Sequence, residues 1–251
     1  MEVAEHIAAI RRDAPLLSAA AAAAGLEAPV PSCPQWVVRD LVRHQGGVHR
    51  WATTIVATPR TEPWRVDLDE VAGTWPDDAG LLDWFETGYQ GLIAALENAS
   101  PDVRCWTFLR ASSPLAMWAR RQAHETAMHR ADAELAAGRQ APAYPARFAA
   151  DGIDELLSCF ITRRSSPLRA DPARTFGVRC DDVAADWLVR IGPDTVRTTA
   201  IGDEVPDCTL RGRADELYLA LWSRPEWGAL SVQGDRAVLD LFLDKVHIRW
   251  T

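Results

Sequence analysis

The first half of the chain alternates long amphipathic segments with loops that contain proline or glycine. Within each segment, apolar residues recur every three or four positions, which is the spacing of one face of a helix. The segments span residues 3–24, 36–56, 79–99 and about 114–137. Gly25 follows the first segment, and Ser113 and Pro114 open the last, as is common at helix ends. The pattern therefore predicts four helices that pack as a bundle.

Beyond residue 146 the pattern changes to short runs rich in β-branched residues, with amphipathic segments before and after them. The β-type runs are residues 174–180, 186–192, 194–200 and 208–213, and the helical segments are 147–164, 214–223 and 235–246. Strands followed by amphipathic helices predict a small α+β domain. We therefore expect an all-α domain over 1–145 and an α+β domain over 146–251, joined in the stretch 139–147.

Composition narrows the class of protein. The net charge of -8 and the pI near 5.3 argue against a nucleic-acid surface, which needs a basic stripe. No run approaches the ~18 apolar residues of a membrane span, and the acidic first residues do not resemble a secretory signal. The five cysteines show no CxxC spacing and are interpreted as reduced thiols. A cytoplasmic protein is the expectation, and the sequence gives no indication of its oligomeric state.

One polar residue interrupts the apolar face of the second predicted helix. This face consists of Val37, Leu41, His44, Val48, Trp51 and Ile55. A stripe with this spacing faces the interior of a bundle, so His44 is expected to point inward. His49 lies about 140° further around the helix, because each residue turns it by about 100°. The two histidines therefore cannot point to the same spot.

The fourth predicted helix carries a carboxylate and an imidazole on a similar stripe, which consists of Leu115, Trp118, Gln122, Glu125, His129, Asp132 and Ala136. Glu125 and His129 are one turn apart, so their side chains lie side by side. Burying both without a partner would be costly. A divalent metal would satisfy both, with His44 of the facing helix as a third ligand. Such a set leaves an open coordination position, as in catalytic zinc sites, although iron or nickel would also fit.

The sequence alone leaves other interpretations of these residues open. A Glu–His pair one turn apart is also common on helix surfaces, and His49 competes with His44 as a ligand. The stretch HETAM begins like a zinc-protease motif, but Met128 stands where that motif needs histidine. His124 lies off the face that carries Glu125, and we expect it at the rim of the site. Among the tryptophans, Trp51, Trp84 and Trp118 are expected in the core.

Two motifs on these helices can be compared with known families. The segment VPSCPQWVVRDLVRHQGGVHRWA contains Pro31, Pro34, Trp36, Asp40, Leu41 and His44, and RRQAHETAMHRADAE contains Ala123, His124, Glu125, His129, Arg130 and Asp132. Both resemble signatures of the mycothiol-dependent maleylpyruvate isomerase family, part of the DinB-like superfamily. The segment VQGDRAVLDLFL is similar to the end of that family's second domain, which resembles sterol-carrier-type folds.

The resemblance implies a DinB-like four-helix bundle followed by a sterol-carrier-like α+β domain. It implies a divalent metal, usually zinc, on His44, Glu125 and His129, with mycothiol as co-substrate. Gln122 and Asp132 are candidates for orienting the ligands, although Asp132 can equally form an ordinary pair with an arginine. The candidates for binding an acidic thiol and an anionic substrate are Arg43, Arg121, Arg130 and Arg236.

An open metal position, together with the thiol that the resemblance implies, predicts thiol chemistry on an electrophilic small molecule. A free thiol with a pKa of about 8.5 is mostly protonated at neutral pH, whereas coordination to a divalent cation deprotonates it. The thiolate can add to an electrophilic carbon, and the outcome is cis–trans isomerisation if the thiol is expelled or S-transfer if the adduct persists. The alternatives are a non-catalytic protein that binds or sequesters a small ligand, and a metal-dependent hydrolase that uses bound water.

Overall fold

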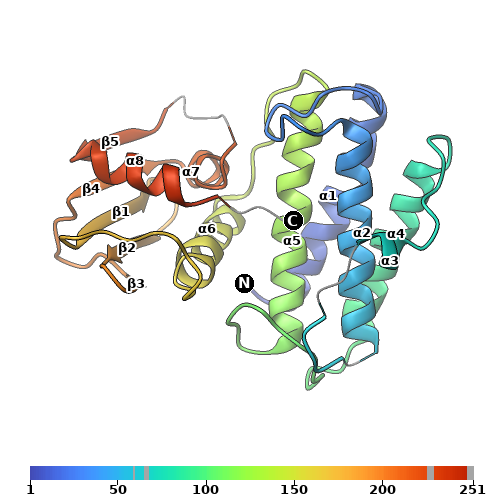
Figure 1. The fold of residues 1–251 in the computed structure, drawn as a ribbon, viewed down its shortest axis with the longest axis horizontal. Helices are drawn as coiled ribbons and strands as arrows, with labels where there is room; N and C mark the ends of the chain where they lie inside the picture. The colour runs from blue at the N-terminus through green and yellow to red at the C-terminus, as the bar shows by residue number, and fades with distance from the viewer. Residues whose placement is uncertain (59, 65–67, 225–228, 248–251) are drawn as a thin grey trace. The chain divides into compact units, whose positions relative to one another are not determined.

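The computed structural model describes residues 1–58, 60–64, 68–224 and 229–247. They form two compact units, Met1–Pro142 and Ala143–Thr251 (Figure 1). The first unit is helical and the second is built around a mixed sheet, in the order that the sequence pattern predicts. None of the described helices is long and apolar enough to cross a membrane.

Four long helices make up most of the first unit. The helices of this unit are α1 (Val3–Ala24), α2 (Val38–Ala57), α3 (Leu68–Ala72), α4 (Leu81–Asn98) and α5 (Pro114–Ala136). Helix α1 packs against α5 and α4, and α2 packs against α4 and α5. The sequence pattern did not predict α3, which lies in the connection between the second and third predicted helices. Five residues are too few for a helical period to be recognised.

The sequence signals at the ends of the long helices have the expected geometry. Ser113 is the N-cap of α5, and its Oγ accepts a hydrogen bond of 3.1 Å from the backbone N–H of Ala116. Gly25 ends α1 with a φ of 82°, a conformation that favours glycine. The alanine face of α5 packs tightly, since Ala119, Ala123 and Ala127 are completely buried. These features fix the helix that carries Glu125 and His129.

The second unit contains a five-stranded sheet with the strand order β3-β2-β1-β4-β5. Its elements are α6 (Ala146–Asp154), the π-helical turn η1 (Glu155–Phe160), β1 (Arg174–Cys180), β2 (Asp186–Ile191), β3 (Val196–Thr199), β4 (Cys208–Gly212), α7 (Ala214–Leu221), β5 (Ser231–Gly234) and α8 (Arg236–Lys245). Strands β1 and β4 are parallel, and the other pairs are antiparallel. The sequence pattern missed β5, which is short and largely exposed.

The two faces of this sheet differ in chemistry, because successive side chains of a strand point to opposite faces. Phe176 and Val178 of β1 are completely buried on one face. The ring of Phe176 lies 5.0 Å from the ring of Phe242 of α8, which places that helix on the same face. The strand registers place four arginines on the opposite face: Arg179, Arg190, Arg197 and Arg211.

Candidate metal centre

Three side chains from two helices converge inside the first unit. His44 of α2 lies opposite Glu125 and His129 of α5, and one possible ligand atom from each lies within 4.8 Å of the others. Oε1 of Glu125 is 3.4 Å from Nε2 of His44 and 3.3 Å from Nε2 of His129. These separations are long for good hydrogen bonds. They match the edge of a tetrahedron around zinc, which is about 3.3–3.5 Å for ligand bonds of about 2.0–2.1 Å.

The three residues are also buried to a similar degree. Their exposed fractions are 8% for His44, 4% for Glu125 and 6% for His129. Because water is nearly excluded, charges at this position interact more strongly than they would at the surface. The residue types, the converging atoms and the dry surroundings therefore fit a divalent metal.

Arg121 holds the second oxygen of the Glu125 carboxylate. Its Nη2 donates to Oε2 of Glu125 at 2.9 Å, and its side chain is almost completely buried. Burial alone would raise the pKa of Glu125, but the charge of Arg121 and the contacts with His129 and His44 hold this pKa well below its usual value. The carboxylate is therefore ionised, and Oε1 is the oxygen directed at the histidines.

Asp132 fixes the orientation of the His129 ring. Nδ1 of His129 lies 2.8 Å from Oδ2 of Asp132, so an Nδ1–H donor leaves Nε2 with its lone pair toward the site. The hydroxyl of Ser32, in the loop before α2, donates to the other oxygen of Asp132 at 2.5 Å. Burial alone would lower the pKa of His129, but the contacts with Asp132 and Glu125 outweigh burial and raise it.

His44 lies between Glu125 and an aromatic ring. Its pKa is lowered, mainly by burial, which favours the neutral imidazole that a metal requires. The ring of Trp36 lies 4.9 Å from the ring of His44 and 6.2 Å from that of His129. Trp36 thus covers both imidazoles from the side of the loop before α2.

The other two histidines discussed from the sequence lie in different surroundings. His49 is completely buried, and its Nε2 lies 2.9 Å from Oγ1 of Thr126 and 2.6 Å from Nε2 of Gln45. Burial lowers its pKa to about 3. The expectation that His124 lies at a rim was wrong: it is completely buried, with its ring edge-on to His6 at 6.0 Å, because the alanine face around it packs closely.

The remaining candidate residues are distributed more widely. Gln122 is 1% exposed, and neither polar atom of its amide has a hydrogen-bond partner among the described residues. Arg130 donates to Asp13 at 2.8 Å, and the guanidinium of Arg43 lies 5.6 Å from the centre of the Trp75 ring. Arg236 belongs to the second unit, where its side chain is 71% exposed and lies 3.5 Å from Asp240.

Two residues near the ligands were not identified as site residues by the helical pattern. Ser32 contacts Asp132 across 100 positions of the chain, and Trp36 lies beside His44 and His129. Both belong to the proline-containing loop before α2, which has no period from which a side-chain direction can be inferred. The signal available for Trp36 was its place in the family motif.

The arrangement defines a class of two-domain proteins in which a helical first domain, with a buried His–Glu–His group, precedes a domain with a mixed sheet. Residues 7–134 match the family model of the mycothiol maleylpyruvate isomerase N-terminal domain, and residues 147–241 match that of the MDMPI C-terminal domain. The chain belongs to the mycothiol maleylpyruvate isomerase family.

Two solved structures have a similar fold. A crystal structure of the mycothiol-dependent maleylpyruvate isomerase is 12% identical, covers 93% of each chain and has a TM-score of 0.63. A structure of a mutant of the mycothiol-dependent maleylpyruvate isomerase, with one histidine replaced by alanine, is 13% identical, covers 93% of each chain and has a TM-score of 0.64. No curated protein sequence matches the chain.

Proposed function

We propose that this protein is a mycothiol-dependent isomerase in which His44, Glu125 and His129 hold one divalent metal ion, zinc. The observation that carries the proposal is the convergence of three buried donor atoms at separations of 3.3 and 3.4 Å, which suit a tetrahedral ion. The names of the similar structures support mycothiol as the thiol. We also propose that the two domains follow the DinB-like bundle and the sterol-carrier-like fold.

The charges around the site favour an anionic ligand. Glu125 and Asp132 contribute two negative charges, Arg121 contributes one positive charge, and the histidines are neutral as ligands. With a divalent ion the sum is one positive charge, which a single thiolate neutralises. A divalent metal bound here would supply the charge that keeps a coordinated thiol deprotonated.

The protein side chains orient the ligands and exclude water. Asp132 holds the Nδ1–H of His129, and Arg121 holds one oxygen of Glu125, so that one donor atom of each remains directed at the site. Trp36 shields the imidazoles from the loop side. A dry site protects a thiolate from protonation and a reactive substrate from water. Gln122 offers a buried amide that can donate and accept hydrogen bonds.

The substrate class follows from this chemistry: a small molecule with a conjugated or strained electrophilic carbon. Maleylpyruvate, part of the name of the similar isomerase, is the first molecule to test. An adduct that expels the thiol gives an isomerase, and one that keeps it gives an S-transferase. Arg43, Arg130 and Arg236 remain our candidates for binding anionic groups. For Arg121, its bond to Glu125 favours a role in holding that carboxylate.

The first experiment is elemental analysis of protein purified without chelator or histidine tag. We expect about one zinc ion per chain, and the loss of zinc in His44→Gln and Glu125→Gln. His49→Gln is the matched control, because His49 is a buried histidine of the same helix outside the converging group. Absence of metal from the wild type after incubation with zinc contradicts the proposal.

The second experiment measures turnover of maleylpyruvate with and without mycothiol. Isomerisation that requires both thiol and metal supports the proposal, and accumulation of a thiol adduct identifies an S-transferase. Consumption of substrate without thiol would instead identify a hydrolase. Ligand binding without turnover would identify a non-catalytic binding protein.

A further inference from the structure

The second unit contains a pair of arginines that the proposed reaction does not use. Arg179 of β1 and Arg211 of β4 are direct partners in the register of two parallel strands, so their side chains leave the sheet on the same face. Like charges directly opposite each other on a sheet are destabilising. An arrangement of this kind calls for a negative group that contacts both guanidinium ions.

The neighbouring carboxylates do not supply that group to Arg179. Asp186, its register partner on β2, accepts a hydrogen bond of 2.9 Å from the backbone N–H of Ile201. Asp181 accepts a hydrogen bond of 2.5 Å from the Nε–H of Arg211. Within the described part of the chain, Arg179 has no hydrogen bond or ion pair, although its Nε is buried. A half-buried guanidinium without a partner is costly unless a ligand or water completes its hydrogen bonds.

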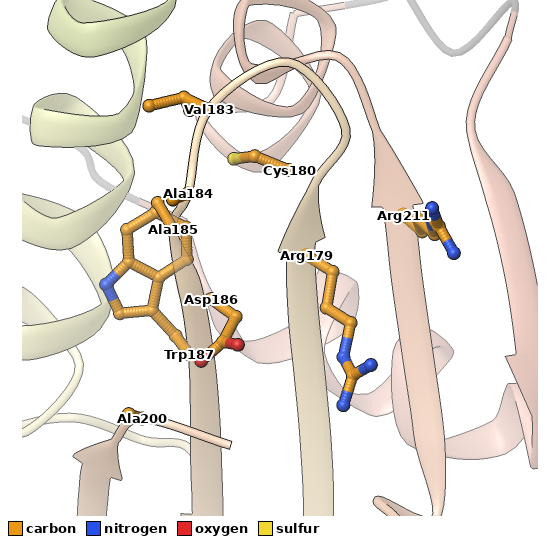
Figure 2. Close-up of a pocket in the computed structure, with 9 residues that line it drawn as sticks. All are labelled: Arg179, Cys180, Val183, Ala184, Ala185, Asp186, Trp187, Ala200 and Arg211. Carbon is orange, nitrogen blue, oxygen red and sulfur yellow. The ribbon is translucent and has the colours of Figure 1, made fainter. Parts of the chain in front are cut away.

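The two arginines line a cavity of about 610 Å³ at the end of the sheet where β1 turns into β2. Figure 2 shows their side chains on neighbouring strands, with Asp186 on the other side of Arg179. The rest of the lining includes the carboxylate of Asp186 and is otherwise mainly apolar: Cys180, Val183, Ala184, Ala185, Trp187 and Ala200. The volume is in the range of small-molecule sites.

The connection from β3 to β4 bounds the cavity. Because β3 and β4 lie on opposite sides of β2 and β1, this segment must cross the sheet. It crosses on the arginine face: a Cβ built on Gly177 would lie 2.8 Å from Cγ of Pro206. The sheet is therefore covered at Gly177 and accessible at Arg179, two residues further along β1.

We propose that this cavity binds a small molecule that carries a phosphate or carboxylate group next to an apolar group. The planar guanidinium of Arg179 binds two oxygens of the anion, and the terminal nitrogens of Arg211 complete the contact. The apolar part lies against the turn that joins β1 to β2, because Trp187 alternates to the opposite face of the sheet. Every residue that lines this site belongs to the second unit, whereas the three candidate metal ligands belong to the first.

The test uses phenyl phosphate, which combines both features, in calorimetric titrations of the full chain at physiological salt. We expect saturable binding to the wild type, and at least about tenfold weaker binding to Arg179→Gln and Arg211→Gln. Arg197→Gln is the matched control, since Arg197 is an exposed arginine on the same face of the sheet and outside the cavity. The control should bind as the wild type does.

One further variant and a test of folding separate the possible causes of a weak result. His44→Gln should bind phenyl phosphate like the wild type, which distinguishes this site from the metal centre and leaves the inference testable if the proposed function fails. If circular dichroism shows that Arg179→Gln is misfolded, the affinity of Arg211→Gln for phenyl phosphate tests the inference. No saturable binding to the wild type, or an equal loss in Arg197→Gln, overturns the inference.

Discussion

Arg121 and Glu125 form a buried ion pair one helical turn apart, with Nη2 of Arg121 2.9 Å from Oε2 of Glu125. The pair leaves only Oε1 of the carboxylate directed at His44 and His129. It therefore determines which oxygen is available to an ion, and it keeps the carboxylate charged when no ion is bound.

Replacing Arg121 by methionine should destabilise the metal-free protein more than the metal-bound protein. Removing one partner of a buried ion pair leaves an uncompensated charge and costs about 3–5 kcal/mol. An ion in the site would partly replace the missing positive charge. Urea unfolding with chelator and with zinc measures both effects. Arg11→Met is the control: Arg11 forms an exposed pair with Glu97, and its loss should cost less than about 1 kcal/mol. Equal losses in the two variants would contradict the prediction.

Replacing Asp132 by asparagine should weaken metal binding by about 10–100-fold, because such hydrogen bonds to metal-ligating histidines set ring orientation and basicity. Ser32→Ala should have a smaller effect in the same direction, since Ser32 acts only through Asp132. Competition with a chromophoric chelator measures the affinity. Asp83→Asn, at an exposed position of α4, should leave it unchanged. An unaltered affinity in Asp132→Asn would show that His129 does not need this partner.

Helical periodicity predicted both the long helices and the residues that meet at the candidate site. A spacing of three or four residues determines the direction of a side chain, so the stripes containing His44, Glu125 and His129 could be identified without tertiary information. The same local rule located Ser113 at the start of α5. The sequence could not show how close the two stripes come to each other. That distance depends on how α2 and α5 pack against each other in the folded chain.

Contacts made by loops and short elements were not predictable in this way. Ser32 reaches Asp132 across 100 positions, and nothing in a loop sequence specifies such a distance. Strand β5 has four residues, too few to show an alternating pattern. For Arg121, the sequence indicated a contact with an anionic ligand, whereas in the structure its buried guanidinium donates to the carboxylate of Glu125. The residue type alone does not specify which of these contacts forms.

Stability should fall with decreasing pH through His49. Burial lowers the pKa of this histidine from its ordinary value of 6.5 to about 3. Above pH 6.5 the group is neutral in both the folded and the unfolded chain. Between these two values only the unfolded chain takes up the proton, so the free energy of unfolding drops by up to about 1.4 kcal/mol for each unit that the pH falls.

Urea unfolding of the wild type and of His49→Gln tests this prediction. Both proteins are measured with a chelator at several pH values between 7 and 5. The glutamine can keep a hydrogen bond to Thr126 but does not titrate. The stability difference between the two proteins should therefore shift in favour of His49→Gln as the pH falls. Parallel pH profiles would mean that His49 is protonated in the folded chain.

A last prediction concerns the packing of α2 against α4, which positions His44. A Cβ on Gly46 would lie 2.2 Å from Cζ3 of Trp84, which cannot occur without displacing the ring. Other contacts hold Trp84 in place: the guanidinium of Arg50 lies 3.7 Å from the centre of its ring and donates a hydrogen bond to its backbone carbonyl. Gly46→Ala should therefore cost about 1–3 kcal/mol of stability, despite the better helix propensity of alanine.

Gly91→Ala is the matched control within α4, because a Cβ there meets no atom within 4 Å. It should stabilise the helix by about 0.5–1 kcal/mol, since alanine loses less backbone entropy than glycine. Urea unfolding gives both values, and zinc titration shows whether the shift of α2 reaches His44. A stabilising Gly46→Ala would show that the two helices can separate without loss, and His44 would then need another explanation for its position.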